Sequence, residues 1–383
     1  MTEHTDNRRQ QRATRCVFFI AGLGMAAWAP LIPFAQSHLA INAGTLGLLL
    51  FCIAAGSMLM MPFTGALIAR LGCRTLILLC GVGLACCLAL LMHITTLHVM
   101  GFSLLLFGAF NGLLDVTMNY QAVIVERASG DSKMSGFHGF YSLGSIAGAG
   151  AVSLMLWFGV PAQWVLIPVA LAILRLLISG APALLTPRNA QEPPAPGALK
   201  ALAHRKVLLI AVLCFILFLT EGAMLDWSAV FMSTERDIPL HLAGWSFTLY
   251  SIAVATLRLF GDRLITRYGN VNILMYSGLV ATAGLTLVTF SDWMPAAFAG
   301  FVIVGIGLAN IIPILFTAAG NQPDISAHVA LPAVTLCGYS GLLTGPALIG
   351  FSAQLTSLSA TFSAGIILLL IVTFTARLSL HRQ

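Results

Sequence analysis

Charged residues are scarce in this chain: Asp, Glu, Lys and Arg make up only 8% of its 383 residues. A soluble domain carries about 25% charged residues, so the composition excludes an ordinary soluble protein. Hydrophobic residues account for 58% of the sequence, and the mean hydropathy is +0.94. These values are typical of a protein that crosses a lipid bilayer several times.

Motifs that mark several other protein classes are also missing. The sequence contains no phosphate-binding glycine loop, no HExxH and no serine-centred hydrolase elbow, which argues against an ATP-driven pump and against a hydrolase. The eight cysteines form no CxxC pair, so we expect no disulfide, no metal site and no cofactor. The polar residues 1–15 and the long apolar run after them are unlike a cleaved signal peptide.

Twelve apolar stretches are long enough to cross ~30 Å of hydrocarbon as α-helices. Each is about twice as long as a strand of a membrane β-barrel, so the sequence predicts an all-α membrane protein. The predicted spans are residues 16–36, 44–68, 75–94, 98–124, 134–157, 163–184, 207–231, 242–266, 271–290, 295–320, 328–354 and 358–378.

The net charge is +6, and the cations that produce it are distributed unevenly along the chain. All of the 19 Lys and Arg except Arg175, Arg236 and Arg258 fall on one predicted side of the membrane. By the positive-inside rule this side is the cytoplasm, which places both chain termini there. The basic surplus therefore indicates topology, and no nucleic-acid partner is expected.

The chain repeats itself at one constant offset. The same shift aligns Arg70-x-Gly72 with Arg267-x-Gly269, Gly108 with Gly305 and Gly144 with Gly341. This register indicates two six-helix halves related as parallel repeats, joined by a polar, proline-rich linker. We expect a cytoplasmic tail (1–15), an N-terminal half (16–185), a cytoplasmic linker (186–206) and a C-terminal half (207–383).

Three carboxylates lie well inside predicted spans: Asp115 in the fourth, and Glu221 and Asp226 in the seventh. Asn111 and Asn119 lie one turn before and after Asp115, so these three residues share one face of the helix. An aspartate at membrane depth costs roughly 2.5–3.5 kcal/mol and is expected to face a wet cavity or a partner. Glu221 and Asp226 lie roughly 140° apart around their helix, so we expect different roles for them.

The loop after the second span resembles the signature of the major facilitator superfamily, G-x-x-x-D-R-x-G-x-R. Residues 65–74 read Gly-Ala-Leu-Ile-Ala-Arg-Leu-Gly-Cys-Arg and depart from it only at Ala69; the copy in residues 262–269 also lacks the acid, with Thr266 in its place. The twelve spans and the six-plus-six repeat are similar to the same family. Because the usual acid is missing, Arg258 and Asp262, one turn apart, are candidates for a substitute ion pair.

The resemblance implies a secondary transporter that works by alternating access and is not an enzyme. It also implies residues that control the conformational change. These candidate gating residues are Gly65, Arg70, Gly72, Arg74, His138, Arg258, Asp262, Arg267 and Gly269. For His138, whose side chain would otherwise sense protons, packing or capping at a helix end is the alternative.

Three further stretches resemble the MosC/YbjJ-like branch of bacterial inner-membrane transporters. They are Asp115-Val-Thr-Met-Asn119, residues 137–144 (Phe-His-Gly-Phe-Tyr-Ser-Leu-Gly) and residues 221–227 (Glu-Gly-Ala-Met-Leu-Asp-Trp). The acid and asparagine of the fourth span are more distantly similar to the proton-coupled fucose symporter type. This resemblance implies a multi-pass protein of the bacterial inner membrane.

In the resembled fold the first, fourth, seventh and tenth spans line a central cavity. Asp115, Glu221 and Asp226 are candidates for proton coupling, because ionisable groups at membrane depth commonly form proton pathways. A structural ion pair or hydrogen bond is the alternative for each, and an outer gate or interface anchor for Asp226.

Amide, hydroxyl and aromatic groups from the same region suit a small polar solute. The candidate substrate-binding residues are Trp28, Gln36, Asn111, Asn119, Trp227, Tyr250, Asn310, Thr317 and Tyr339. For the tryptophans, packing at the lipid interface is the alternative.

These features favour symport of a small polar solute, sugar-like or related, with protons. The expected partners are that solute, protons and the lipid bilayer, and we expect a monomer. Efflux of amphipathic drugs by proton antiport is the first alternative. Two alternatives are more remote: a membrane sensor, and an embedded enzyme with Asp115 and Glu221 as a carboxylate pair. The predicted loops are short, so they offer little surface on which a sensor or an enzyme could bind its ligand.

Overall fold

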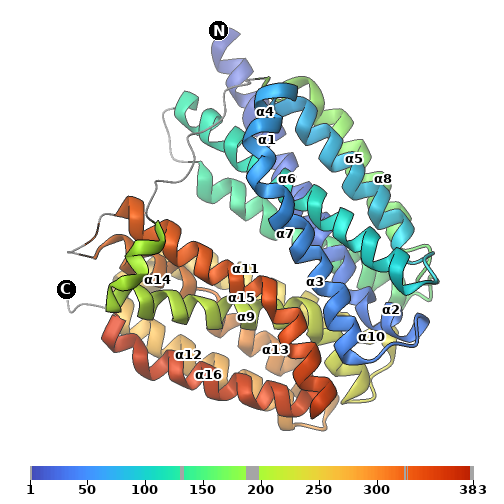
Figure 1. Ribbon diagram of the computed structural model, residues 1–383, viewed down its shortest axis with the longest axis vertical. Helices are drawn as coiled ribbons and strands as arrows, with labels where there is room; N and C mark the ends of the chain where they lie inside the picture. Colours follow the sequence, from blue (N-terminus) through green and yellow to red (C-terminus); the bar gives the residue numbers. More distant parts are fainter. Residues whose placement is uncertain (1, 130–132, 187–197, 323–324, 326, 380–383) are drawn as a thin grey trace. The chain divides into compact units, whose positions relative to one another are not determined.

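The computed structural model describes residues 2–129, 133–186, 198–322, 325 and 327–379, and every regular element among them is helical (Figure 1). Twelve helical segments of these residues are long and apolar enough to cross a membrane. They run from Asn7–His38 to Leu358–Thr375, and each overlaps one predicted span. The prediction of an all-α membrane fold with twelve transmembrane helices is confirmed.

The largest difference from the predicted spans lies at the N-terminus. The sequence predicts a tail over residues 1–15, whereas the first helix begins at Thr2 and its membrane-length part at Asn7. Arg and Gln are frequent here and are good helix formers, so the helix continues beyond its apolar region. A hydrogen bond of 3.0 Å from Gln11 Nε2 to Asn7 Oδ1, one turn earlier, supports it.

The chain divides into two compact units. The first unit consists of Met1–Ile41, Leu49–Glu192 and Leu240–Gly244, and the second of Asn42–Leu48, Pro193–Pro239 and Trp245–Gln383. Close glycine contacts explain the two short segments. Gly47 packs in the second unit against the backbone of Pro346 and Gly350, and Gly244 packs in the first against Pro30.

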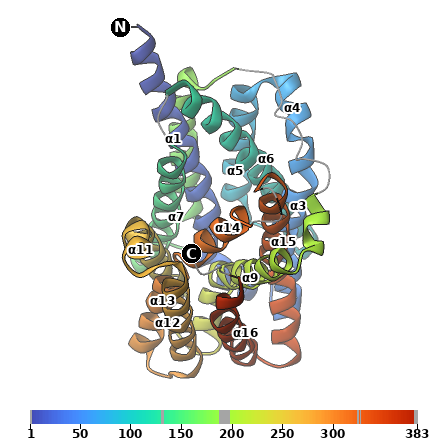
Figure 2. The same cartoon turned by 90° about the vertical axis from the view of Figure 1, so that its left-hand side faces the viewer.

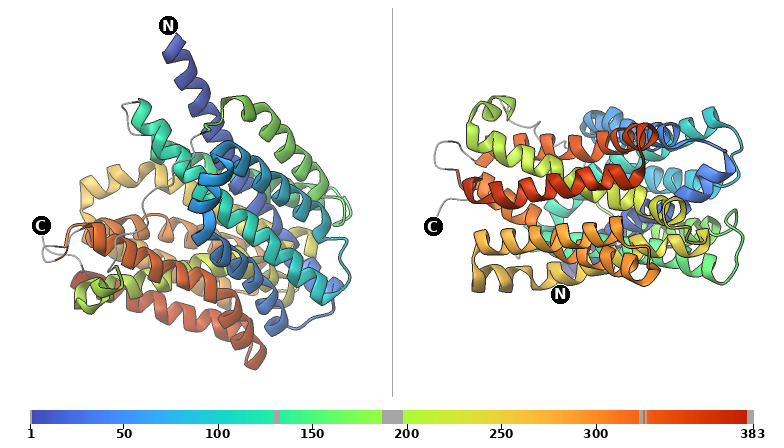
Figure 3. Two further views of the ribbon diagram at one scale, coloured as in Figure 1. Left: turned by 45° about the horizontal axis from the view of Figure 1, so that its top comes forward. Right: turned by 90° about the horizontal axis from the view of Figure 1, so that it is seen from below.

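In the first unit, α1 contacts α6, α7 and α8, and α5 contacts α6 and α8. Figure 3 shows α5 and α6, in blue and blue-green, running side by side. The helices that contribute to this unit, with η for 3-10 turns, are α1 (Thr2–Trp28), η1 (Ala29–Leu31), α2 (Ile32–His38), α3 (Ala43–Met60), η2 (Met61–Phe63), α4 (Thr64–Leu71), α5 (Cys73–Leu91), α6 (Leu97–Ser129), α7 (Met134–Trp157), α8 (Leu166–Gly180), η3 (Ala181–Ala183) and α10 (Leu240–Ala243).

In the second unit, α9 contacts α11, α14, α15 and α16, and α12 contacts α13 and α16. The neighbouring positions of α12 and α13 are visible in Figure 2, and those of α12 and α16 in Figure 1. The elements of this unit are η4 (Ala198–Ala203), α9 (Arg205–Thr234), α11 (Trp245–Tyr268), α12 (Asn270–Phe290), α13 (Met294–Leu308), α14 (Ile311–Gly320), α15 (Ala327–Leu355) and α16 (Leu358–Ser379).

Corresponding glycines bring corresponding helices together in the two units. A Cβ atom at Gly144 of α7 would collide with the carbonyl oxygen of Phe19 in α1, and one at Gly341 of α15 with that of Phe215 in α9. Small residues at such positions let helix backbones approach closely. The repeated glycines at 144 and 341 thus serve as packing positions.

The repeat also extends to backbone angles. Gly72, between α4 and α5, has φ 81° and ψ 154°, and Gly269, between α11 and α12, has φ 80° and ψ 154°. This region is essentially restricted to glycine. Both copies of the Arg-x-Gly motif therefore make the same sharp turn.

Prolines accompany breaks in the first and tenth membrane-length segments. In the first, Pro30 and Pro33 accompany the 3-10 turn between α1 and α2. In the tenth, α13 ends at Leu308 and α14 begins at Ile311, with Pro313 in its first turn. Because proline lacks an N–H, it removes one helical hydrogen bond and frees a carbonyl group for another donor.

Candidate functional site

An ion pair joins α9 to α11 in the second unit. Arg258 Nη2 lies 3.1 Å from Glu221 Oε1, and both residues belong to membrane-length segments. The side chain of Arg258 is 40% exposed and that of Glu221 21%. The pair therefore lies at a surface of the unit and not in its packed interior.

The same guanidinium group binds the backbone at the break between α13 and α14. Arg258 Nε donates a hydrogen bond of 3.1 Å to the carbonyl oxygen of Ala309. In a continuous helix this carbonyl would accept from the N–H of residue 313, but Pro313 has none. The proline thus provides the acceptor that positions Arg258.

A second hydrogen bond runs in the opposite direction between the same elements. Asn310 Nδ2 donates to the carbonyl oxygen of Leu257 at 3.4 Å, and the Asn310 side chain is buried. A Cβ atom at Gly261 would overlap the Asn310 amide, so glycine there allows the close approach. The predicted substrate residue Asn310 is therefore used, in this conformation, to hold the helix break against α11.

Aromatic side chains surround the Glu221 end of this site. Phe218, one turn before Glu221 on α9, has its ring centroid 5.2 Å from Tyr339 of α15 and 6.3 Å from Phe316 of α14. Tyr339 is 43% exposed, whereas Tyr250 of α11 is buried. Tyr250 interacts electrostatically with both Glu221 and Arg258. Four residues that the sequence predicts to be functional therefore lie near one face of α9 in the second unit: Glu221, Tyr250, Arg258 and Tyr339.

The predicted polar stripe of the fourth span lies on α6 in the first unit. Asn111, Asp115 and Asn119 are all half-buried, while Leu114 and Met118 between them are buried. Asn119 Nδ2 donates to the backbone carbonyl of Asp115 at 2.8 Å. Within the described part of the chain, no side chain forms a hydrogen bond or ion pair with the Asp115 carboxylate.

Asp226 and two predicted tryptophans lie in the packed interior. Asp226 is 8% exposed, Trp227 is completely buried and Trp28 is 3% exposed. Among the described atoms, neither indole Nε1 has a hydrogen-bond partner. In this conformation neither ring is accessible to a solute.

Two other predicted substrate residues remain closer to the surface. Gln36 of α2 is half-buried, and Thr317 of α14 is exposed. The Thr317 hydroxyl donates to the carbonyl oxygen of Pro313 at 3.0 Å, one turn earlier on the same helix. Thr317 therefore belongs to the region of the helix break, two turns from Asn310.

The candidate gating residues of the first unit lie around the Gly72 turn. Gly65 and Arg74 are half-buried and Arg70 is exposed. Neither arginine forms an ion pair with another described residue. His138 of α7 packs edge-on against Phe18 of α1 with ring centroids 5.1 Å apart, which agrees with a packing role.

The corresponding residues of the second unit are only partly described. Arg267, in the last turn of α11, lies over the ring of Tyr268, with its Cζ atom 5.3 Å from the ring centroid. The side chain of Asp262 lies outside the described residues, so its predicted ion pair with Arg258 stays a prediction. What the structure gives for Arg258 is the contact with Glu221.

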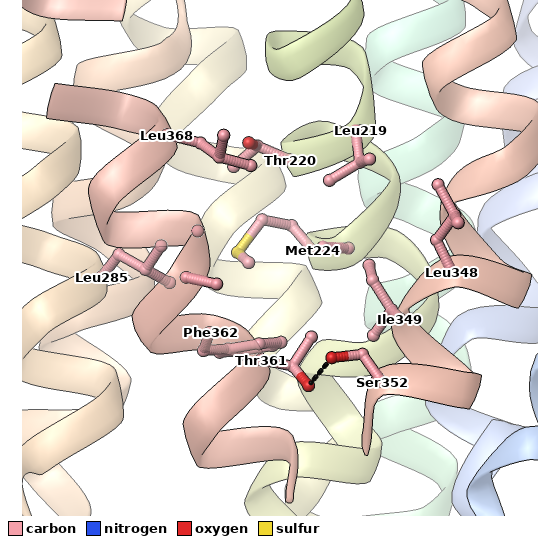
Figure 4. A pocket seen from close by; sticks show the side chains of 13 residues that line it. Leu219, Thr220, Met224, Leu285, Leu348, Ile349, Ser352, Thr361, Phe362 and Leu368 are labelled. Carbon is pink, nitrogen blue, oxygen red and sulfur yellow. Dashed lines mark hydrogen bonds between the residues drawn. The ribbon is translucent and has the colours of Figure 1, made fainter. Parts of the chain in front are cut away.

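A separate cavity of about 180 Å³ lies within the second unit (Figure 4). Residues of α9, α12, α15 and α16 line it, and most are aliphatic. Its hydroxyl groups include Thr361, whose Oγ1 donates to Ser352 Oγ at 3.0 Å. Leu219 and Ala223, which line it from α9, lie roughly 160° around that helix from Glu221, so the cavity is distinct from the ion-pair site.

No part of the described chain brings together three or more His, Cys, Asp or Glu side chains that could hold a metal ion. The chemistry available at the ion-pair site is that of a carboxylate, a guanidinium group, an amide and aromatic rings. Such groups bind polar solutes and exchange protons.

Comparison with known proteins identifies the family to which this fold belongs. The model of the Major Facilitator Superfamily matches residues 16–341. An MFS-type transporter of Yersinia pestis is 48% identical over 369 residues, which cover 96% of this chain and 95% of that protein. Membrane protein MosC of Rhizobium meliloti is 31% identical over 346 residues, covering 89% of this chain and 83% of MosC.

Solved structures share the fold at much lower identity. The nucleoside transporter NupG has a TM-score of 0.79 at 14% identity, covering 96% of this chain and 99% of that one. A bacterial homologue of the human lysosomal transporter Spinster has a TM-score of 0.71 at 12% identity, covering 96% of each chain.

Fold, helices and relatives together define a multi-pass membrane transporter, not an enzyme. The chain belongs to the Major Facilitator Superfamily, and its similarity to MosC confirms the predicted branch.

Sequence reasoning missed the partner of Glu221. An arginine inside a span needs a compensating acid, and the seventh span of the same half carries the embedded carboxylates Glu221 and Asp226. That signal was sufficient to suggest Arg258. Phe218 and Phe316 gave no signal, because phenylalanines are common throughout the spans.

Proposed function

We propose that the protein is a proton-coupled secondary transporter that moves a small polar solute across the bacterial inner membrane by alternating access. Asp115 and Glu221 are the proposed proton-binding groups. The distribution of Lys and Arg supports an orientation with both termini and the linker in the cytoplasm.

The observation that carries this proposal is the ion pair between Glu221 and Arg258 at a broken helix. A proton on Glu221 removes its negative charge and so weakens its hold on Arg258. Because Arg258 also binds Ala309 at the break, the protonation state of one carboxylate is linked to the contact between α11 and α13–α14. Such a link between a charge and a discontinuous helix suits a transport cycle.

Asp115 supports the proposal from the first unit. It lies in a membrane-length helix, is half-buried and lacks a charged partner among the described residues. An embedded carboxylate without a fixed partner is free to gain and lose a proton. Asn111 and Asn119 on the same face supply amide groups for a polar, hydroxylated solute.

A thermal-stability screen tests the proposal. The full-length protein in detergent is heated with glucose, sorbitol, lactate or uridine at about pH 5 and about pH 8. A ligand that binds the folded state stabilises it by about 2.7 kcal/mol at a hundredfold excess over Kd. We expect one solute class to raise Tm in a pH-dependent manner. The pH dependence should be lost in Asp115→Asn or Glu221→Gln.

The matched control is Asp292→Asn, which makes the same chemical change at a fully exposed position outside the spans. Each stabilising solute is then tested in proteoliposomes that contain a pH indicator, where symport into the lumen acidifies it. Stabilisation unaffected by pH and by both amide variants would contradict coupling through these residues.

Efflux of amphipathic drugs by proton antiport is less well supported. A large apolar cavity would favour it, and the second unit has an apolar cavity of about 180 Å³. Pockets for drug-sized ligands usually span about 300–1,000 Å³, so this cavity is too small for such a cargo. Stabilisation by amphipathic cations alone would nevertheless replace the polar-solute proposal.

A further inference from the structure

We propose that Arg258 recognises the solute, that this solute is a carboxylate-bearing anion, and that its carboxylate replaces Glu221 at the guanidinium group when Glu221 is protonated. This inference rests on the proposed function and narrows its substrate class from polar solutes in general to acid anions.

The hydrogen bonds of Arg258 leave one edge of the guanidinium group for a ligand. Nε is occupied by the carbonyl oxygen of Ala309, and Nη2 by Glu221. Nη1 has no acceptor among the described residues. If Glu221 withdraws, Nη1 and Nη2 both become available, and this edge of an arginine binds a carboxylate with two parallel hydrogen bonds.

The bond to Ala309 keeps the guanidinium group in place during such an exchange. The acceptor of this bond is available in either protonation state of Glu221, because Pro313 leaves the Ala309 carbonyl without its helical partner. Arg258 is also the more exposed member of the pair, at 40% against 21% for Glu221. An incoming anion therefore meets a fixed and accessible cation.

Charge balance explains why an anion binds Arg258 when Glu221 is protonated. The ionised pair is neutral, but protonation of Glu221 leaves Arg258, within a membrane-length helix, without a compensating charge among the described side chains. An unpaired charge at that depth is unfavourable, and an anionic ligand restores neutrality. A neutral sugar cannot do so, which is why the geometry favours a carboxylate.

Among the described side chains, no other titratable group faces Glu221 as a competing anion; the side chain of Asp262, one turn after Arg258 on α11, lies outside them. The titratable groups near Glu221 are Arg258 and the phenol of Tyr250 from α11, and from α15 the phenol of Tyr339, which reaches α9 through Phe218. On α9 itself Cys214 and Asp226 are the nearest, and Asp226 lies roughly 140° around the helix. The described side chains of α14 and α16 include no charged group.

The predicted stoichiometry is one proton transported with each negative charge of the anion. Glu221 takes up a proton as the anion binds Arg258, and it returns the proton to the solution when the anion leaves and the ion pair reforms. The site therefore carries the anion and the proton together without net charge.

The test compares acids with neutral molecules of similar shape. Full-length protein in detergent is titrated with gluconate and sorbitol, glucuronate and glucose, and lactate and 1,2-propanediol, at about pH 5 and about pH 8. Binding is measured as the rise in Tm. For the wild-type protein we expect an acid to bind at least about tenfold more tightly at the lower pH, and its neutral counterpart to have little effect.

Variants of the pair distinguish recognition from folding. Glu221→Gln should bind the acid equally well at both pH values, because Arg258 is permanently unpaired. Arg258→Gln should abolish the effect of the acid. The double variant Glu221→Gln, Arg258→Gln removes both charges and thus avoids an unpaired ion, so its loss of acid binding reports on Arg258 and not on instability. Arg175→Gln, an exposed arginine in α8, is the control.

The outcomes separate this inference from the proposed function. The inference is overturned if no acid stabilises the protein, or if acids still do so in the double variant. It is also overturned if only neutral probes stabilise the protein, with a pH dependence that Asp115→Asn removes and Arg258→Gln retains; in that case the proposed function stands. Stabilisation by neutral probes without any pH dependence contradicts both.

Discussion

The fourth and tenth membrane helices correspond in the repeat, yet they differ in continuity and charge. In the first unit, α6 runs unbroken from Leu97 to Ser129 and carries Asp115, which has no charged partner among the described residues. In the second, α13 and α14 are separated by a break whose free carbonyl binds Arg258. In the alignment of the repeat, Val116 of α6 corresponds to Pro313 of α14. The proline at this position accounts for the break in the tenth membrane helix.

The second and eighth helices differ in the opposite way. The 3-10 turn Met61–Phe63, which contains Pro62, interrupts the second membrane helix, whereas α11 is continuous from Trp245 to Tyr268. The continuous helix is the one that carries Arg258. The comparison shows that two copies of one six-helix design can keep their packing glycines while the proline positions decide where the backbone becomes available for polar contacts.

The largest expected effect comes from exchanging the residues that make the difference. Val116→Pro should destabilise the protein by about 3 kcal/mol or more, because it removes a hydrogen bond and clashes within a continuous helix. Pro313→Val should cost far less, since it restores an N–H that the Ala309 carbonyl can accept. Thermal unfolding in detergent measures both changes. Equal losses in the two variants would mean that proline position does not explain the break.

A smaller effect should distinguish the glycines of the two units. Gly148→Ala places a methyl group against the backbone of Leu23 and Ala27, whereas at Gly345 the nearest atoms, of Leu219, are 3.8 Å or more away. Overpacking of this kind costs about 1–3 kcal/mol, so Gly148→Ala should lower Tm clearly and Gly345→Ala should not. The measurement is the difference in Tm between the two alanine variants. A larger loss at Gly345 would contradict the packing described for α9 and α15.

The turns at Gly72 and Gly269 should both resist a side chain. Gly72→Ala and Gly269→Ala each force a Cβ atom into a region restricted to glycine, at a cost of roughly 1–3 kcal/mol, and no neighbouring atom lies close to a Cβ at Gly269. Because Gly72 is buried and Gly269 is exposed, we expect the loss at Gly72 to be at least as large as that at Gly269, measured by thermal unfolding. An unchanged Tm in either variant would contradict the backbone angles described for that turn.

The smallest effect concerns the acids. Glu221→Gln leaves Arg258 without its counter-ion, which is unfavourable within a membrane-length segment, but the partial exposure of the pair should limit the cost to about 1 kcal/mol. Asp115→Asn breaks no ion pair and should leave Tm unchanged or raise it. Unfolding at about pH 8, where both carboxylates are least protonated, gives the clearest comparison. Destabilisation by Asp115→Asn alone would reveal a structural role for that carboxylate.

The burial of Trp28, Trp227 and Tyr250 illustrates where prediction from sequence ends. Their positions within spans followed from hydropathy, but the direction of each side chain did not. Helices that are apolar on every side carry little information about which face turns inward. Packing against neighbouring helices decides this, and it placed these rings in the interior while leaving Tyr339 exposed.

The sequence by itself determined the twelve spans, the family and the repeat, because hydropathy and spacing can be read directly along the chain. The tertiary structure alone decided that Arg258 contacts Glu221 and Ala309. Those residues are distant in the chain, and whether they meet depends on the rotation of α9 and α11 and on where Pro313 breaks the tenth helix.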